Sequence, residues 1–279
     1  MRRLAAALLA LALSGCAAPD LSDRRDTRAS DLPPMRVFDG PRTVQTTRSN
    51  DLISRDFLDL TFELESGRAV PTFTRFEGPI TLRVLGPRPP TLDRDLSRLL
   101  TRLRREAHIE IGRVDADAPA NITIETVPRA ELQRTVPSAA CFVVPRIADW
   151  DDFRANRRSR RLDWTTLDTR RQLAIFVPGD VAPQEMRDCL HEELAQALGP
   201  LNDLWRLDDS VFNDDNFHTV LTGFDMLILR ATYDPELRSG MRRDEVARAL
   251  PAILARLNPE GRRAGGTPAA PTPRAWSTI

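Results

Sequence analysis

The chain has 279 residues, of which 41% are hydrophobic, and its 40 basic residues balance its 40 acidic ones. This hydrophobic fraction excludes disorder along the whole chain, and the balanced charge argues against a nucleic-acid-binding protein, which usually has a basic excess. Every one of the 40 basic residues is arginine, so mechanisms that need a lysine, such as Schiff-base catalysis or a Walker-type phosphate loop, are excluded.

The N-terminus has the features of a bacterial lipoprotein signal peptide. Two arginines precede an apolar run, 4–13, that suits a signal peptide and is short for a membrane-spanning helix. Residues 13–16 (Leu-Ser-Gly-Cys) resemble the lipobox, where lipoproteins are cleaved and lipidated. We therefore expect residues 1–15 to be removed and Cys16 to carry a lipid. The alternative is an ordinary signal peptide with a chance cysteine.

By its resemblance to lipoproteins, the chain also carries a sorting signal. Ala17 follows the cysteine in place of aspartate, which favours the periplasmic face of the outer membrane.

The segments that flank the expected domain have biased compositions. Residues 16–50 are rich in Asp, Arg, Pro, Ser and Thr without periodicity, which predicts a flexible tether. The Pro- and Ala-rich residues 259–279 predict a disordered tail. Because no repeat or second linker lies between them, we expect one domain over 51–258.

The predicted elements follow the order helix, several strands, then helices, which predicts an α+β fold. Apolar periodicity and turn residues indicate each element. The predicted helices cover 56–65, 92–107 with Thr91 as N-cap, 184–198, and 246–257 with a kink or new start at Pro251. The predicted strands cover 80–85, 108–111, 121–127, 141–144 and 172–177.

The highly charged stretch 150–171 is predicted to be a solvated loop. Its arginine cluster at 157–161 has two interpretations. One is a contact with anionic lipid or nucleic acid, and the other, which we favour, is a plain surface loop.

Two cysteines remain once Cys16 is assigned to lipidation. In an oxidising compartment such a pair tends to form a disulfide, so we predict a bond between Cys141 and Cys189. Two buried free thiols are the alternative, because spacing alone does not place the Cα atoms within reach.

A glutamate lies in the apolar arc of the predicted helix 184–198. At about 100° per residue, Glu193 projects between Met186 and Cys189. Because burial of an unpaired charge costs several kcal/mol, Glu193 needs a cation, a hydrogen-bonding partner, a bound proton or a water-filled cleft. It is either a structural glutamate paired with an arginine or a functional group.

The same helix carries a family resemblance. Residues 192–202 (Glu-Glu-Leu-Ala-Gln-Ala-Leu-Gly-Pro-Leu-Asn) resemble the metzincin zinc-peptidase signature His-Glu-x-x-His-x-x-Gly-x-x-His. Glu193 takes the place of the catalytic general base, and Gly199 that of the glycine. The three histidine ligands are replaced by Glu192, Gln196 and Asn202.

The downstream sequence extends this resemblance. Residues 210–214 stand where the family has its Met-turn, with Phe212 in the methionine position, and 221–234 looks like its terminal helix, which closes near Tyr233. Thr222 and Asp225 also make a capping-box pattern. The whole chain resembles a domain-of-unknown-function family of secreted and lipoprotein bacterial proteins with this degenerate segment. The resemblance implies a single zincin-like domain with a mixed sheet and an active-site-type helix.

The residues at the ligand positions disfavour zinc. Gln196 and Asn202 offer only neutral amide oxygens, which suit Ca²⁺ far better than Zn²⁺. We expect no metal at these positions. If one binds, the amide oxygens favour calcium. We expect His191 at the surface or an edge and find no three-histidine site. Four consecutive side chains carry oxygen atoms: Asn213, Asp214, Asp215 and Asn216. They could help bind Ca²⁺ or form a polar turn. Together with Asp203 and the three ligand positions, they could line one polar cleft.

Two functions follow from these residues. The first is a lipid-anchored envelope protein whose degenerate metzincin-like domain is a non-catalytic binding or scaffolding module, without a cofactor. The second is a divergent metal-dependent hydrolase that uses Glu193 as general base. The expected partners are the membrane, through the lipid on Cys16, and an envelope protein, and no nucleic acid.

Overall fold

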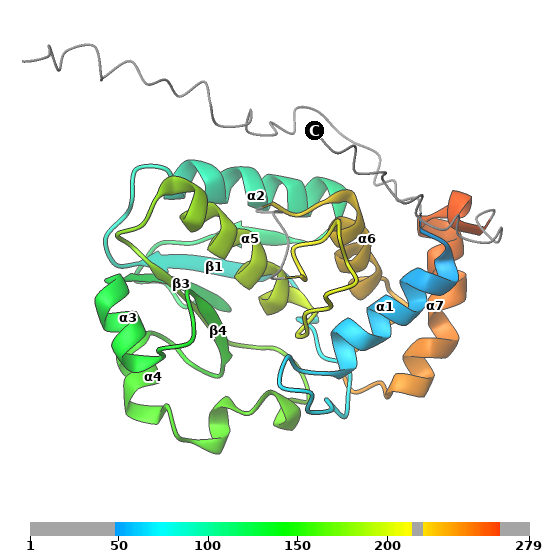
Figure 1. Cartoon of the computed structure of the whole chain (residues 1–279), viewed down its shortest axis with the longest axis horizontal. Coiled ribbons are helices and arrows are strands. Elements are labelled where there is room, and N and C mark those ends of the chain that lie inside the picture. The colour runs from blue at the N-terminus through cyan, green and yellow to red at the C-terminus, as the bar shows by residue number, and fades with distance from the viewer. Residues whose placement is uncertain (1–47, 214–219, 263–279) are drawn as a thin grey trace, which may run out of the picture. The chain divides into compact units, whose positions relative to one another are not determined.

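The computed structural model describes residues 48–213 and 220–262 (Figure 1). Its centre is a five-stranded sheet with the order β2-β1-β3-β5-β4. β1 (Ile80–Leu85), β2 (Ile111–Arg113), β3 (Ile122–Val127) and β5 (Leu173–Pro178) run parallel, and the edge strand β4 (Phe142–Pro145) is antiparallel to β5. The mixed sheet and its helices confirm the α+β class.

Helices cover the sheet and extend beyond one end of it (Figure 1). Short 3-10 turns follow α4 and α7. The helices are α1 (Asn50–Phe62), α2 (Leu92–Glu106), α3 (Arg129–Thr135), α4 (Trp150–Asn156), α5 (Pro183–Leu198), α6 (Gly223–Thr232) and α7 (Arg243–Leu257), and the turns are η2 (Arg160–Leu162), η3 (Trp164–Thr166) and η4 (Pro259–Arg262).

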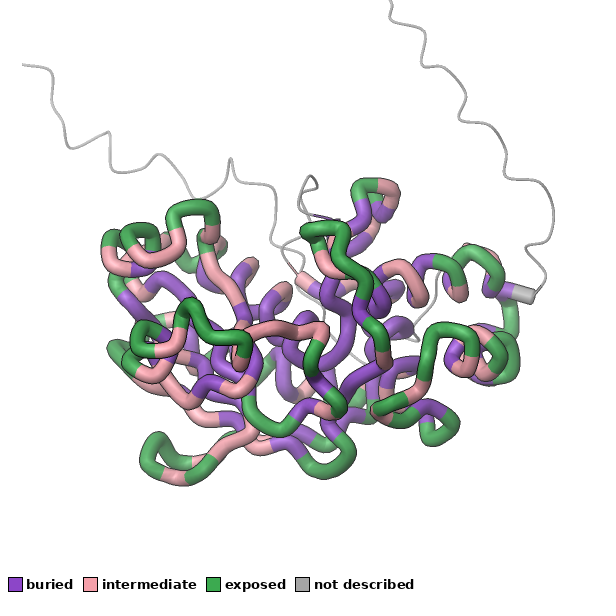
Figure 2. The backbone as a smooth tube through the Cα atoms, turned by 90° about the horizontal axis from the view of Figure 1, so that it is seen from below, coloured by how far each residue is buried: buried purple, intermediate pink, exposed green. Residues whose placement is uncertain are grey.

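The central strand β5 separates two apolar clusters. Leu173, Ile175 and Val177 face the main core with α2 and α5, while Ala174 and Phe176 face a second cluster that contains residues of α3 and α4. Every residue of β5 is buried, as expected for a strand covered on both faces. Figure 2 shows the same distribution, with buried segments inside and exposed ones on the outer turns.

The first and last helices pack side by side in opposite directions. At one end, the amide of Asn258 donates to Asn50 Oδ1 (3.0 Å), and Asn50 Nδ2 donates to the carbonyl of Asn258 (3.2 Å). At the other end, Arg243 Nη1 donates to the carbonyl of Leu58 (3.0 Å). These bonds join the two ends of the described domain.

Most predicted strands and helices are confirmed. β1 has the predicted bounds, and β3, β4, β5, α2 and α5 lie within one residue of theirs. Thr91 is the N-cap residue of α2, although its side chain makes no capping hydrogen bond. α1 begins six residues before the predicted 56, because Ser49 caps it and Ile53 joins the buried side of the helix.

Two predictions of local structure are wrong, and one of two alternatives at Pro251 is excluded. The stretch 150–171 is not a solvated loop: it contains α4, η2 and η3, and Trp150 and Phe153 are buried. The strand predicted at 108–111 begins at Ile111, because His108 has a left-handed backbone with φ 59°. Of the two alternatives at Pro251, a kink or a new helix start, the new start is excluded, since α7 continues through this residue.

The predicted disulfide is confirmed. Cys141 and Cys189 are bonded, with Cα atoms 5.9 Å apart. The bond ties the start of β4 to the middle of α5, across 48 residues of sequence. The predicted signal peptide, Cys16, most of the predicted tether and the predicted tail from 263 lie outside the described residues.

Candidate functional site

α5 carries the residues of the metzincin-like motif. Pro183 opens the helix, where its missing N–H costs no hydrogen bond, and α5 packs against β4, β5 and α2. The helix ends at Gly199, which lies tightly against α6. A Cβ atom there would stand 2.9 Å from Thr232 Cγ2, so this contact requires glycine.

A buried arginine closes the C-terminal end of α5. Arg170 is only 3% exposed, and its guanidinium donates to the carbonyls of Gln196 (2.5 Å) and Gly199 (2.6 Å) and to Thr74 Oγ1 (3.3 Å). It also lies over the ring of Trp164, 5.2 Å from the centroid. Burial lowers the pKa of Arg170 to about 10, so it stays charged at neutral pH and satisfies the free carbonyls of the helix end. No spacing in the sequence indicated this role.

Two of the three ligand positions are tied into the fold. Gln196 Nε2 donates to Glu65 Oε1 (3.2 Å), and Asn202 Nδ2 donates to the carbonyl of Asp59 (3.2 Å). Both amides are buried, at 7% and 6% exposure, whereas Glu192 is half-buried. The amides therefore hold the end of α5 and the following loop against α1 and the turn after it.

The general-base position is buried, as predicted. Glu193 is 4% exposed, and the helix neighbours above and below it on the same face, Cys189 and Ala197, are buried too. A carboxylate at this depth has lost most of its hydration, so its surroundings determine whether it is charged.

The prediction for His191 is wrong. It lies in the interior, 6% exposed, and its Nδ1 accepts a hydrogen bond from the backbone N–H of Leu221 (3.0 Å). Burial lowers the pKa of His191 to about 3, and the nearby positive charges of Arg102 and Arg187 act in the same direction. His191 is thus a neutral structural link. His108 is exposed, and His218 lies outside the described residues.

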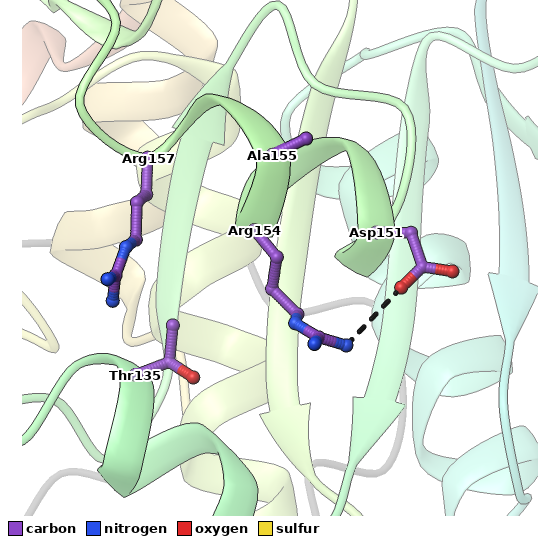
Figure 3. Close-up of a pocket in the computed structure, with 5 residues that line it drawn as sticks. All are labelled: Thr135, Asp151, Arg154, Ala155 and Arg157. Carbon is purple, nitrogen blue, oxygen red and sulfur yellow. Dashed lines mark ion pairs between the residues drawn. The ribbon is translucent and has the colours of Figure 1, made fainter.

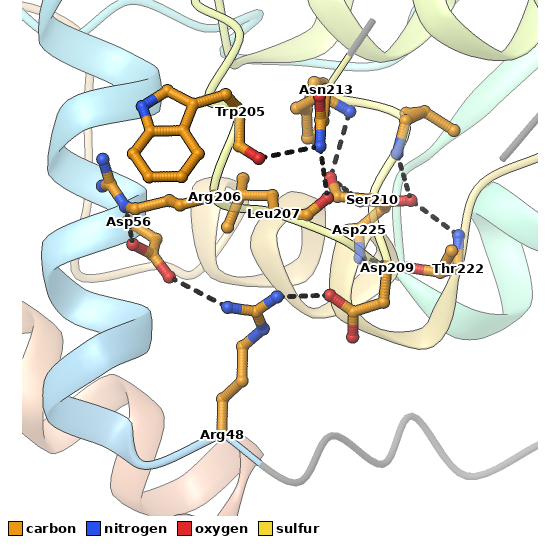
Figure 4. Close-up of polar contacts among 12 residues, drawn as sticks. Arg48, Asp56, Trp205, Arg206, Leu207, Asp209, Ser210, Asn213, Thr222 and Asp225 are labelled. Carbon is orange, nitrogen blue, oxygen red and sulfur yellow. Dashed lines mark hydrogen bonds and ion pairs between the residues drawn. The ribbon is translucent and has the colours of Figure 1, made fainter. Parts of the chain in front are cut away.

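The predicted capping box is confirmed and belongs to a larger buried network (Figure 4). The N–H of Asp225 donates to Thr222 Oγ1 (3.3 Å), and the N–H of Thr222 donates to Asp225 Oδ2 (2.7 Å). The hydroxyl of Ser210 donates to Asp225 Oδ1 (2.5 Å) and accepts from the N–H of Phe212 (3.0 Å). Burial raises the pKa of Asp225 despite these hydrogen bonds. The network joins residues 210–212 to the start of α6.

The remaining predicted residues support the loop between α5 and α6. Phe212 is fully buried. Asn213 Nδ2 donates to the carbonyls of Trp205 (3.1 Å) and Leu207 (3.2 Å). The hydroxyl of Tyr233 donates to the carbonyl of Leu198 (3.1 Å), and burial raises its pKa. Asp203 is half-buried, and Asp214, Asp215 and Asn216 lie outside the described residues.

An ion-pair network that the sequence did not indicate links this loop to α1 (Figure 4). Arg206 donates to Asp56 Oδ1 (2.9 Å) and Asp59 Oδ2 (2.6 Å), and Arg48 pairs with Asp56 (3.6 Å) and Asp209 (2.5 Å). Partial burial raises the pKa of Asp59, but hydrogen bonds from Arg243 and Arg206 outweigh this effect and lower it. Since the partners are about 150 positions apart, no local pattern reveals them.

One large apolar side chain stands out beside this network. Trp205 is 81% exposed, while the carbonyl of the same residue is held by Asn213. Tryptophan is enriched among the residues that dominate protein interfaces.

The described residues provide no evident metal centre. Within 48–213 and 220–262, no three His, Cys, Asp or Glu side chains are grouped so that they could hold a metal ion. Nor does this part of the chain contain a helix with the length and apolar character needed to cross a membrane.

Sequence comparison places the chain in a family. Residues 50–252 match the family described as "Protein of unknown function (DUF2927)". The chain belongs to this family. The matched region starts with α1 and ends within α7, so the family domain includes the sheet, α5 and the loop that carries Trp205. No curated protein and no solved structure matches the chain.

Proposed function

We propose that the chain is a lipid-anchored protein of the bacterial cell envelope whose degenerate metzincin-like domain serves as a non-catalytic binding or scaffolding module. The signal-like N-terminus and Cys16 support anchoring, on the periplasmic face of the outer membrane. The disulfide supports an oxidising compartment, because such bonds are rare in the reducing cytosol. The exposed Trp205 supports a binding role.

This proposal rests on the contacts of Gln196 and Asn202, two of the residues at the positions of the zinc-binding histidines. A catalytic zinc site needs about three nitrogen, sulfur or carboxylate ligands and an open coordination position. Here Gln196 and Asn202 are neutral amides whose N–H groups bond to Glu65 and to the Asp59 carbonyl. These side chains stabilise the fold, and their chemistry does not suit zinc.

The zincin-like part of the proposal is supported by the placement of the motif. α5 packs on a mixed sheet, ends at a glycine in close contact with α6, and is followed by a loop in which Phe212 is buried. His191 does not replace a lost ligand, because its Nδ1 accepts from Leu221.

Metal analysis of the full chain, purified without chelator or affinity-tag metal, tests the proposal. We expect no stoichiometric metal, and no change in Tm when Zn²⁺ or Ca²⁺ is added. A stoichiometric metal that is lost in Glu192→Ala, but kept in the matched surface variant Glu110→Ala, would contradict it. That result would make a substrate screen worthwhile.

The buried carboxylate of Glu193 favours a second candidate, a divergent hydrolase. Glu193 is a buried carboxylate at the position that the family's general base occupies, which is the observation behind this candidate. Peptide-library hydrolysis by the wild type and by Glu193→Gln separates the two. Activity that disappears in a variant with unchanged Tm would establish the hydrolase, whereas no activity and an altered Tm fit the structural role.

A further inference from the structure

An exposed ridge of arginines follows α4. We define the arginine ridge as Arg154, Arg157, Arg158 and Arg160, all of which are exposed. Residues 154–161 contain no Asp or Glu, so the ridge is a local concentration of positive charge on a chain with no net charge. Such a cluster repels itself and gains most from an anion close by.

The ridge borders a hollow of about 580 Å³ between α3 and α4. Arg157 extends from the end of α4 toward Thr135 at the end of α3, whereas Arg154 is turned toward the carboxylate of Asp151, which also lines the hollow (Figure 3). Thr135 Oγ1 donates its proton to the carbonyl of Glu131 (3.0 Å), so the two guanidiniums are the donors that the hollow presents. A second hollow, of about 530 Å³, lies outside the ridge and is lined by Arg88, Arg113, Val114, Asp115, Ala116 and Ala118.

The structure separates ridge arginines from arginines that hold the loop together. Arg161 makes a two-pronged bond to Asp152, at 3.2 and 3.0 Å. Arg154 has only long contacts, 3.6 Å to Asp151 and 3.7 Å to Glu131, and the Asp151 carboxylate is 91% exposed. In the described part of the chain, no carboxylate lies within 4.0 Å of three of the ridge guanidiniums, those of Arg157, Arg158 and Arg160.

A purely structural explanation covers only part of the ridge. Cations near a helix C-terminus are favourable, which accounts for Arg154 in the last turn of α4 and Arg157 at its C-cap. It does not account for Arg158 and Arg160, which lie beyond the helix.

Aromatic packing holds the backbone of α4 under the ridge in place, while the arginine side chains themselves are exposed. Phe153 packs against Phe142 (5.1 Å between centroids), and Trp150 packs against Phe176 (5.0 Å). A ligand at the ridge would therefore have to order the arginine side chains but not the helix that carries Arg154.

We infer that the arginine ridge and the adjoining hollow form a binding site for a phosphate-bearing ligand. Planar guanidinium forks match phosphate oxygens in two-pronged hydrogen bonds, which makes arginine the side chain best suited to this group. The phosphate could belong to a soluble compound or to the headgroup of an anionic lipid. This inference does not depend on the proposed function of the α5 region.

The test compares the full chain with two variants that change the net charge equally. Arg157→Glu/Arg158→Glu reverses the ridge, and Arg98→Glu/Arg105→Glu reverses two exposed arginines of α2. Calorimetry with inorganic pyrophosphate probes a soluble source. Co-sedimentation with vesicles of phosphatidylcholine, alone or mixed with phosphatidylglycerol, probes a headgroup source. Because a lipid on Cys16 would bring every protein to the vesicles, all proteins in the sedimentation assay also carry Cys16→Ser.

We expect the wild type and the α2 variant to bind at least one probe, and the ridge variant to bind it at least about tenfold more weakly. Binding should also weaken as salt rises. Pyrophosphate binding would indicate a soluble ligand, and vesicle binding that requires phosphatidylglycerol, without pyrophosphate binding, a lipid headgroup. Equal losses in both variants, no binding to either probe, or tighter binding to a DNA fragment than to both would overturn the inference. Circular dichroism checks that each variant is folded.

Discussion

Two sets of arginines lie within the same stretch of sequence, 154–170, and have opposite environments. Arg170 is 3% exposed, donates hydrogen bonds to two carbonyls and a hydroxyl, and lies over Trp164. The arginine ridge is exposed, and three of its four members have no carboxylate nearby in the described part of the chain. Because every basic residue of this chain is an arginine, the residue type does not distinguish structural from exposed basic side chains. The hydrogen-bond acceptors around each guanidinium distinguish them.

The largest effect is expected from Arg170→Met. Methionine replaces the apolar stem of Arg170 but has no guanidinium. The buried carbonyls of Gln196 and Gly199 would therefore lose their hydrogen-bond donor. We expect a loss of about 3–5 kcal/mol in the free energy of unfolding, measured with urea. The adjacent, exposed Arg171→Met is the control, with a loss under about 0.5 kcal/mol. Equal losses in both would remove the contrast between the two sets.

His191 extends the comparison to a second buried basic residue. Its pKa of about 3 in the folded protein lies below the usual 6.5, so the unfolded chain binds a proton more readily between these values. Stability should therefore fall as pH falls from about 6.5 toward 3, by about 3 kcal/mol between pH 7 and pH 4.

Urea unfolding at several pH values measures this loss. His191→Asn keeps an acceptor for Leu221 and should flatten the profile in this window. The same change at the exposed His108 is the control and should leave the profile unchanged. A His191→Asn protein that loses stability as steeply as the wild type would assign the acid sensitivity to another group.

A smaller effect is expected from Trp164→Leu. The substitution removes the aromatic ring 5.2 Å below the Arg170 guanidinium but keeps an apolar side chain. We expect a loss of about 1–2 kcal/mol. A double-mutant cycle with Arg170→Met should show that the two losses are not additive, because both residues share one interaction. Additive losses would mean that Trp164 acts only by packing.

The smallest effect on stability is expected from the triple variant Arg157→Ala, Arg158→Ala and Arg160→Ala. Because these side chains make no ion pair in the described structure, unfolding should change by less than about 0.5 kcal/mol. The melting temperature at low and high salt checks this. A loss of more than about 1 kcal/mol would make the ridge structural, like Arg170.

The sequence predicted elements whose signals are local. β1 alternates apolar and polar residues and is bounded by turn residues, and the leucines of α2 recur at helical spacing, so their bounds needed no tertiary information. The capping box of Thr222 and Asp225 is equally local. The short α4 was missed because its charges conceal a buried face of only two residues, Trp150 and Phe153.

The candidate site was predicted less completely, because its partners are distant in sequence. Helical periodicity placed Glu193 on a buried face. The burial of His191 depends on Leu221, which is 30 positions away, and Gln196 depends on Glu65, which is 131 away. A polar residue is stable in the interior only where the fold brings it a partner, and one sequence does not specify which distant group that is.

The joined ends of the domain have a mechanical consequence. The paired amides of Asn50 and Asn258 hold the start of α1 next to the end of α7. A force that pulls on the two ends of the domain would therefore act on two neighbouring points. Such a force would separate α1 from α7 one contact after another, starting at Asn50 and Asn258. It would not slide the strands of the sheet past one another. The domain should therefore yield at low force when it is stretched between its ends, while the sheet and α5 initially keep their structure.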